Sequence, residues 1–239
     1  LIALAILCLP DLRRNKRPLV LFGEWAGRRS SDNPFHLYEY FTQIGVDCYF
    51  VTNVNFQEKR VNIVRPWSIK NFWLSLRATH VFYSHDIHDL NPYFITHRSK
   101  KINLWHGVGP KCLALDNRHS IIFYPKTLTD WIKAYFFRRK RIMPDLFVAP
   151  CKNLIPFYLT AFDLSPSQII RLPYVRSVVQ IQQMKEKTGR KSSKVLYAPT
   201  LRSPSQLQAL DKFILNLSEC LLPLGLELEV AFHPANIDH

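Results

Sequence analysis

Two histidines follow hydrophobic segments that read as strands, where an enzyme could place a catalytic base. Trp105-His106-Gly107 ends one segment, and Phe232-His233-Pro234 ends another. Ligands of open parallel sheets bind beyond the carboxyl ends of the strands. A neutral imidazole can act as a general base, and a donating imidazole can stabilise developing negative charge. Both could act on one substrate if the strands belong to two facing lobes. Each could instead bond only to backbone at its strand end.

Several further residues have the chemistry of phosphate binding. Gly107 leaves room for backbone N–H groups to approach an anion. Thr200 and Arg202 follow the segment 194–199, where a hydroxyl and a guanidinium beside a helix N-terminus could hold a phosphate. The same two residues would serve equally as a helix cap and a solvated arginine. Lys111 could contact phosphate or simply be exposed.

Polar residues also fill the turn after the first predicted strand. Arg28, Ser31 and Asn33 could line a substrate channel there. Asp32 or Asn33 is also a good N-cap for the following helix, whose first turn holds Pro34. Asn33 could therefore be a cap and nothing more.

A second polar turn holds residues that metals prefer. His85-Asp86 and His88-Asp89 offer the ligand types of zinc or manganese. They fit an ordinary polar turn after a strand equally well. No residue that would hydrogen-bond to these ligands and orient them can be identified from the sequence. We predict no metal site here and leave Mg²⁺ open as a cofactor.

The composition indicates a folded protein with an anionic partner. The chain has 239 residues, 47% of them hydrophobic, and a formal net charge of +14. Such a chain can bury a core and is not a disordered tail. Its positive charge suits nucleic acid, an anionic membrane or a polyanionic substrate. The five cysteines contain no CxxC pair, which argues against a zinc site or a disulfide framework.

Two segments suggest the membrane surface. In 133–141 (KAYFFRRKR), apolar rings could enter an interface while the basic side chains meet anionic headgroups. We predict membrane contact by Tyr135, Phe136, Phe137, Arg138, Arg139, Lys140 and Arg141. A solvated helix end or RNA binding would use the same residues, but no RNA-binding motif supports the latter. Residues 1–17, apolar and then basic, are a predicted membrane-proximal segment or a buried helix or strand.

Strand and helix patterns alternate along the rest of the chain, which favours a parallel α/β sheet. Strands are predicted over 18–25, 48–54, 61–64, 80–83, 101–105, 145–149, 169–174, 194–199 and 226–232. Helices are predicted from 32 or 33 to 45 and over 68–77, 153–162 and 206–222. We expect one Rossmann-like lobe over 18–183, a linker over 184–193, and the start of a second lobe, cut short, over 194–239. Two such lobes make a GT-B-like fold.

Four segments in order resemble the CDP-glycerol glycerophosphotransferase family, which includes teichoic-acid primases and polymerases and related capsule polymerases. They are 27–41 (GRRSSDNPFHLYEYF), 104–116 (LWHGVGPKCLALD), 196–202 (LYAPTLR) and 232–234 (FHP). The chain departs from the family at Val108-Gly109, where Thr-Pro is common, at Cys112, where a second lysine is common, and at 173–176 (PYVR). The family's Asp-Tyr-Ser-Ser motif would lie beyond His239.

The resemblance implies a reaction and roles for these residues. His106 would deprotonate an acceptor hydroxyl that attacks a CDP-activated polyol, and His233 would bind the donor diphosphate or stabilise the departing CMP. Donor phosphates would contact Thr200, Arg202, Gly107 and Lys111, and the acceptor would contact Asn33, Arg28 and Ser31.

It also implies partners and a location. The donor would be CDP-glycerol or a similar CDP-polyol, and the acceptor a lipid-linked polyanion at the cytoplasmic face of the cell membrane. No nucleic acid is expected. A glycosyltransferase using a nucleotide sugar, or a basic membrane- or RNA-binding module without activity, remain the alternatives.

Overall fold

The computed structural model describes residues 18–56, 62–91, 99–107, 113–119, 123–136, 143–186, 193–199 and 204–232. The chain divides into two compact units, with the boundary between Gln183 and Met184.

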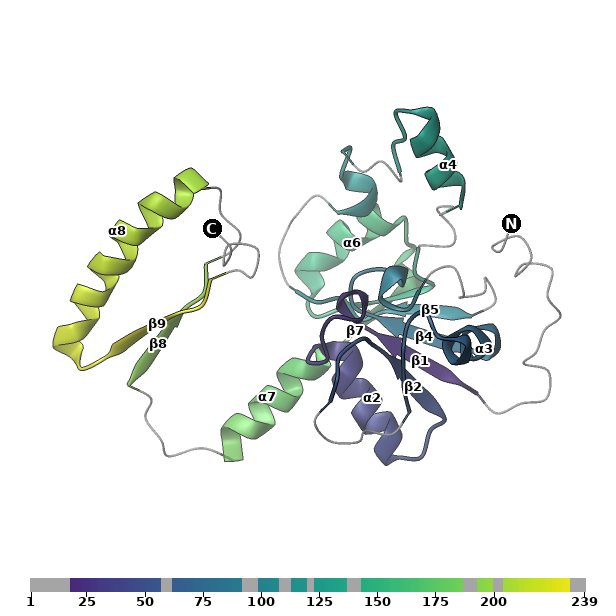
Figure 1. Cartoon of the computed structure of the whole chain (residues 1–239), viewed down its shortest axis with the longest axis horizontal. Coiled ribbons are helices and arrows are strands. Elements are labelled where there is room, and N and C mark those ends of the chain that lie inside the picture. The colour runs from purple at the N-terminus through teal and green to yellow at the C-terminus, as the bar shows by residue number, and fades with distance from the viewer. Residues whose placement is uncertain are drawn as a thin grey trace. The chain divides into compact units, whose positions relative to one another are not determined.

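The first unit is built on one parallel sheet (Figure 1). Among the described residues, seven strands lie in the order β3-β2-β1-β4-β5-β6-β7, and every neighbouring pair is parallel. Their bounds are β1 Val20–Gly23, β2 Cys48–Val51, β3 Ile63–Val64, β4 His80–Tyr83, β5 Lys100–Asn103, β6 Leu146–Ala149 and β7 Ile169–Arg171.

Helices cover both faces of this sheet because successive strand residues point to opposite sides. Helix α2 (Asn33–Gln43) packs against Val20, Phe22 and Phe50 on one face. On the other face, α3 (Ile69–Arg77) packs near Leu21 and Val81, and α6 (Ile155–Phe162) packs against Phe147. In Figure 1, α2 and α6 lie on opposite sides of the sheet. The chain also forms α4 (Leu128–Phe136) and α7 (Val175–Glu186).

The strand order reverses between β1 and β4, and in open parallel sheets ligands bind beyond the carboxyl ends of the strands at such a reversal. Gly23, the last residue of β1, allows the segments after the two strands to approach closely. A Cβ atom at this position would lie 2.3 Å from the backbone oxygen of Asp89. Any side chain at position 23 would therefore force the β4 loop away from β1.

The second unit contains a smaller parallel sheet. Strands β8 (Lys194–Tyr197) and β9 (Glu227–Val230) pair in parallel, and α8 (Pro204–Leu221) connects them and packs against β9. This is the strand–helix–strand unit that the sequence predicts over 194–232.

The predicted strands are present, but several end earlier than expected. Strand β5 ends at Asn103 rather than at Trp105, since Trp105 adopts a left-handed conformation with φ 53°. Trp25 likewise leaves the β1 ladder, at φ 49°. Helices α4 and α7 are missing from the predicted elements. Helix α7 also runs three residues into the predicted linker, since it continues to Glu186.

Candidate active site

The candidate site lies at the carboxyl ends of β1, β4 and β5, where the strand order reverses. Residues after all three strands contribute to it: Glu24 and Trp25 after β1, Ser84, His85 and Asp89 after β4, and His106 after β5. The left-handed backbone of Trp105 is uncommon for a bulky residue. Such conformations cluster at functional sites. Here it ends the ladder and turns the chain so that His106 reaches the loop after β4.

The His106 ring is held in a defined orientation. Its Nδ1 lies 3.0 Å from the backbone oxygen of Ser84. A carbonyl oxygen can only accept a hydrogen bond, so in this contact Nδ1 carries the hydrogen. In the neutral ring, Nε2 then has a free lone pair and can accept a proton. Burial lowers the pKa of His106, with a smaller contribution from the charge of His85, so the neutral base dominates at physiological pH.

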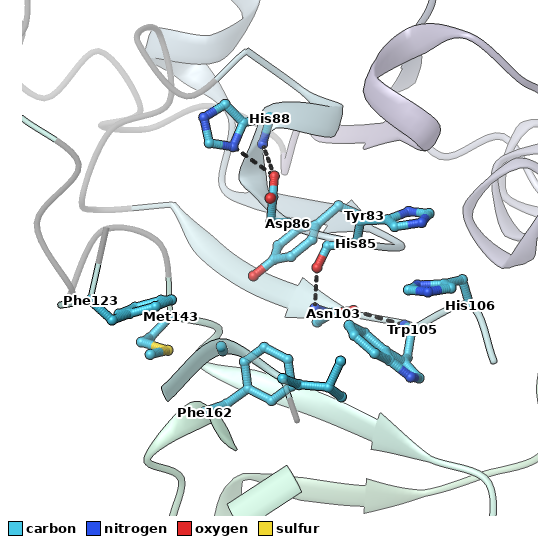
Figure 2. A pocket seen from close by; sticks show the side chains of 12 residues that line it. Tyr83, His85, Asp86, His88, Asn103, Trp105, His106, Phe123, Met143 and Phe162 are labelled. Carbon is cyan, nitrogen blue, oxygen red and sulfur yellow. Dashed lines mark hydrogen bonds and ion pairs between the residues drawn. The ribbon is translucent and has the colours of Figure 1, made fainter. Parts of the chain in front are cut away.

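Aromatic rings surround this base. The His85 ring stacks on His106 with centroids 3.7 Å apart and an angle of 11° between the ring planes. Figure 2 shows the two rings one above the other. Trp25 meets both edge-on, at 4.3 Å from His85 and 5.9 Å from His106. Burial lowers the pKa of His85 as well, so a stack of two neutral imidazoles is favoured over a charged pair.

The backbone around His106 is clamped by the first residues of α2 and α7. Arg176 donates from Nη2 to the His106 carbonyl at 2.7 Å and from Nη1 to the buried Asp32 carboxylate at 2.9 Å. Asn33 donates from Nδ2 to the Trp105 carbonyl at 2.7 Å and accepts from the Arg176 backbone N–H at 3.2 Å. These bonds join segments about 70 and 140 residues apart in the sequence.

Glu24 organises the turn before α2 from a fully buried position. Its carboxylate accepts backbone N–H bonds from Ser31 at 2.6 Å, Asp32 at 3.0 Å and Phe35 at 3.2 Å. Burial raises the pKa of Glu24 to about 7, against the effect of these three donors. The carboxyl group therefore titrates near neutral pH while holding the loop that carries Asp32.

Asp89 has the same function for the loop after β4. It accepts backbone N–H bonds from Ala26 at 2.8 Å, Ser84 at 3.0 Å and His85 at 2.9 Å. Burial raises its pKa to about 6. Through Ala26 and Ser84, this single carboxyl group joins the turns after β1 and β4.

The structure brings some predicted site residues together. Asn33 is almost fully buried, and Asp32 is the N-cap of α2, so Asn33 holds the Trp105 carbonyl rather than capping the helix. Gly107 lies beside His106, and its carbonyl accepts a 2.7 Å bond from the Tyr174 hydroxyl. Arg28 and Ser31 are exposed on the turn before α2. Contacts of Asn33, Arg28 and Ser31 with an acceptor stay predictions.

Other predicted residues lie outside the described part of the chain. They are Lys111, Thr200, Arg202, His233, Phe137, Arg138, Arg139, Lys140 and Arg141, together with the side chain of Phe136. Tyr135 is described and is exposed on α4. The predicted roles of all these residues in donor binding and membrane contact stay predictions.

The positioning residues Glu24, Asp89 and Arg176 were not identified from the sequence. Glu24 is an acidic residue near the end of the strand predicted over 18–25, and Asp89 lies in the polar turn after the strand predicted over 80–83. A carboxyl group at such a place is the available signal. Arg176 lies in the 173–176 segment that was compared with the family, but no local pattern connects it with Asp32.

The two His-Asp pairs after β4 are used within the protein. Asp86 accepts from His88 Nδ1 at 2.7 Å, and Asp89 binds backbone N–H groups. Across the described ranges, no group of three or more histidine, cysteine or carboxylate side chains is arranged to hold a metal ion.

A structure of the wall teichoic acid polymerase TagF matches with a TM-score of 0.72 and 20% identity, covering 98% of this chain and 61% of that one. A TagF variant soaked with CDPG matches with a TM-score of 0.65 and 20% identity, covering 98% and 60%. These likenesses confirm the predicted α/β, GT-B-like fold class.

Sequence comparisons agree with the fold. A teichoic acid poly(glycerol phosphate) polymerase of Staphylococcus epidermidis is 24% identical over an alignment of 212 residues that covers 81% of this chain and 29% of that protein. The chain thus spans less than a third of this curated relative and about 60% of the solved structures. The family model for CDP-glycerol:poly(glycerophosphate) glycerophosphotransferase matches residues 6–225. The resemblance of the four sequence motifs is therefore confirmed: the chain belongs to the CDP-glycerol:poly(glycerophosphate) glycerophosphotransferase family.

Proposed function

We propose that this protein transfers a glycerol phosphate unit from CDP-glycerol to a hydroxyl group of a membrane-linked, teichoic-acid or capsule-type acceptor and releases CMP. The observation that carries the proposal is the hydrogen bond between His106 Nδ1 and the Ser84 carbonyl, which leaves Nε2 as a proton acceptor. Family membership supplies the donor class, and a family relative is a poly(glycerol phosphate) polymerase.

In the proposed reaction, the acceptor oxygen attacks the phosphorus that bears glycerol. The new P–O bond forms as the bond to the bridging oxygen of CMP breaks, and the acceptor proton moves to His106 Nε2. CMP departs with the bridging oxygen. The chain's contribution at this end is to hold a neutral base rigidly, since positioning and general base catalysis both lower the barrier.

The donor phosphates are assigned to Thr200, Arg202, Lys111 and His233 by their places in the family motifs. A cationic or donating side chain at these positions would stabilise the charge that moves to CMP. Involvement of Mg²⁺ stays a prediction. It is tested by measuring CMP release with and without added magnesium.

The membrane-linked acceptor is supported by the surface of α4. Leu128, Trp131, Ile132 and Tyr135 of this helix are all at least half exposed. A helix that exposes apolar and aromatic side chains next to basic residues can lie in a membrane interface. None of the helices in the described ranges is long and apolar enough to span a bilayer. We propose peripheral attachment at the cytoplasmic face through α4 and the basic residues that follow it.

Donor choice tests the proposal. The intact protein is incubated with a lipid-linked glycerol phosphate acceptor and with CDP-glycerol, CDP-ribitol or a UDP-sugar, and the released nucleotide is identified as a monophosphate or a diphosphate. CMP release from a CDP-polyol, dependent on acceptor, supports the proposal. UDP release from the UDP-sugar alone would instead assign a transferase that makes a glycosidic bond from a nucleotide sugar.

A further inference from the structure

A pocket of about 340 Å³ opens beside His106, on the face of the sheet that α6 covers (Figure 2). This volume lies at the lower end of the range of roughly 300–1,000 Å³ that is typical of small-molecule sites. Its walls are largely aromatic and apolar, with Trp105, Phe123, Met143 and Phe162 among them. His85 and His106 form part of its lining, so whatever it holds lies next to the proposed base.

Tyr83 presents an unsatisfied polar group to this pocket. The residue is fully buried, and its hydroxyl has no hydrogen-bond partner among the described residues. In Figure 2 the hydroxyl points into the space between Asp86 and the Phe123–Met143 side of the pocket. An unpaired buried hydroxyl costs free energy, so a ligand that bonds to it would recover that loss. Burial also keeps the phenol protonated, because it raises the pKa of Tyr83.

Asp86 supplies a second polar group on the same wall. Both bonds that it accepts, from the backbone N–H and from Nδ1 of His88, are made to Oδ1. Its Oδ2 therefore keeps the capacity to accept from a ligand hydroxyl. Together, Tyr83 and Asp86 offer a donor and an acceptor in the pocket that His106 also lines.

The charges of the lining argue against a phosphate group as the occupant. The residues that line the pocket in the described part of the chain include no lysine or arginine. The hydrogen bond with Asp86 raises the pKa of His88, so any charge on His88 is offset by the Asp86 carboxylate. Burial favours the neutral forms of His85 and His106. Among the described lining residues, a phosphate would find no unpaired cation to replace its lost hydration.

We propose that this Tyr83 pocket binds the uncharged, hydroxyl-bearing end unit of the acceptor, a single sugar or polyol, and presents one of its hydroxyls to His106. The C–H faces of such a unit suit the aromatic walls, while its remaining hydroxyls bond to Tyr83 and Asp86. The proposal rests on the proposed function for the identity of the ligand as an acceptor. The polyanionic part of the acceptor would lie outside the pocket.

Steady-state kinetics of the intact protein test whether the Tyr83 hydroxyl contributes to acceptor binding. Tyr83→Phe removes only the hydroxyl and should raise the KM for the acceptor about two- to tenfold, the value of one neutral hydrogen bond. The KM for CDP-glycerol should stay within twofold, and Tyr40→Phe, at an exposed tyrosine of α2, should change neither. An unchanged acceptor KM, or a rise in the donor KM instead, would overturn the proposal.

Binding without turnover separates the pocket from the reaction. Saturation-transfer NMR compares glycerol, ribitol and methyl glucoside with glycerol 3-phosphate on the intact protein. At least one neutral compound should show stronger saturation transfer than glycerol 3-phosphate. The Leu113→Trp substitution, which fills the pocket, should abolish the saturation transfer to that compound. The compound that binds best distinguishes a polyol from a sugar.

A glycerol 3-phosphate signal as strong as that of every neutral compound, or full binding to Leu113→Trp, would refute the pocket assignment. Failure of the wild-type protein to release CMP would refute the proposed function, and the NMR result would still decide the pocket.

Discussion

The sheet has an amino-terminal edge, where its strands begin, and a carboxyl edge, where they end. Each of these edges carries a partly buried histidine beside a cavity, but different contacts hold the two histidines. At the amino-terminal edge, His80 begins β4 and borders a cavity of about 500 Å³ lined by Val20, Phe41 and Phe82, among others. Its Nδ1 lies 3.0 Å from the Thr79 hydroxyl, its neighbour in the sequence. At the carboxyl edge, His106 borders a smaller pocket of about 340 Å³.

Burial lowers the pKa of both histidines, so neither a lowered pKa nor cavity size identifies the candidate site. The distinguishing feature is long-range positioning. His106 and its flanking backbone are held by Ser84, Asn33 and Arg176. Buried carboxyl groups in turn hold the loops that carry these partners. Many polar groups fixed around one imidazole are typical of a catalytic site and are costly without a function.

The largest expected effect is the loss of activity when His106 is replaced, compared with the same replacement of His80. His106→Ala should lower acceptor-dependent CMP release about 10²- to 10⁴-fold, the usual contribution of a general base. His80→Ala, at the other edge, should stay within about threefold of wild type if its histidine is structural. Circular dichroism checks that both variants fold. Comparable losses of activity in the two variants would remove the distinction between the edges.

The next effect concerns the ion pair at each edge. Arg176→Met leaves the Asp32 carboxylate, only 3% exposed, without its cation and should cost about 1–3 kcal/mol of stability. Lys101→Met leaves Asp145, which is 45% exposed and can be hydrated, so its cost should be about 1 kcal/mol or less.

Urea unfolding measures both costs, and only Arg176→Met should also lower CMP release. A larger loss of stability in the lysine variant would contradict the proposed importance of the buried carboxylate.

Buried Glu24 should make the carboxyl edge sensitive to pH. Its folded pKa, about 7, lies above the unfolded value, so it stabilises the fold most below about pH 4.5, and this contribution falls as pH rises through 7. The stability cost of Glu24→Gln should therefore be smaller at pH 8 than at pH 5, by about 1–3 kcal/mol.

The exposed Asp47 at the amino edge supplies the control. Asp47→Asn should change stability by about 0.5 kcal/mol or less at both pH values. Urea unfolding at pH 5 and pH 8 gives the comparison, and a Glu24→Gln cost independent of pH would show that Glu24 stays ionised throughout.

The smallest effect should be a shift in the pH dependence of activity. The charge of His85 contributes to lowering the pKa of His106, after burial. His85→Phe keeps a stacked ring and removes that charge, so the acidic limb of the kcat/KM profile should move to higher pH. His80→Phe should leave the limb in place. A limb that moves to lower pH, or an equal shift in both variants, would contradict the assignment of His106 as the base.

The sequence was most informative where the structure depends on residues that are close together in the chain. Strand patterns and a helix cap at Asp32 or Asn33 follow from periodicity and local chemistry; the predicted strands are present, and the cap is Asp32. Helix α7 escaped prediction because it buries none of its residues completely and shows a weak apolar face. Its apolar residues Val178, Ile181 and Met184 are exposed.

The site was predictable only in part, for a related reason. His106 and Asn33 were identified by their positions in the motifs. The functions of Glu24, Asp89 and Arg176 depend on residues that folding brings together, up to 144 positions apart. No pattern within a short window contains that information. The tautomer of His106 likewise follows from a carbonyl 22 residues earlier.

Helix α7 has a mechanical consequence. It holds the His106 carbonyl through Arg176 in its first turn and continues past Gln183, where the second unit begins. A helix of 12 residues is a stiff rod of about 18 Å. Any displacement of this rod along its axis must break the Arg176 bonds or drag the imidazole out of alignment. His106, the proposed proton acceptor, is therefore tethered to the segment through which the chain leaves the first unit.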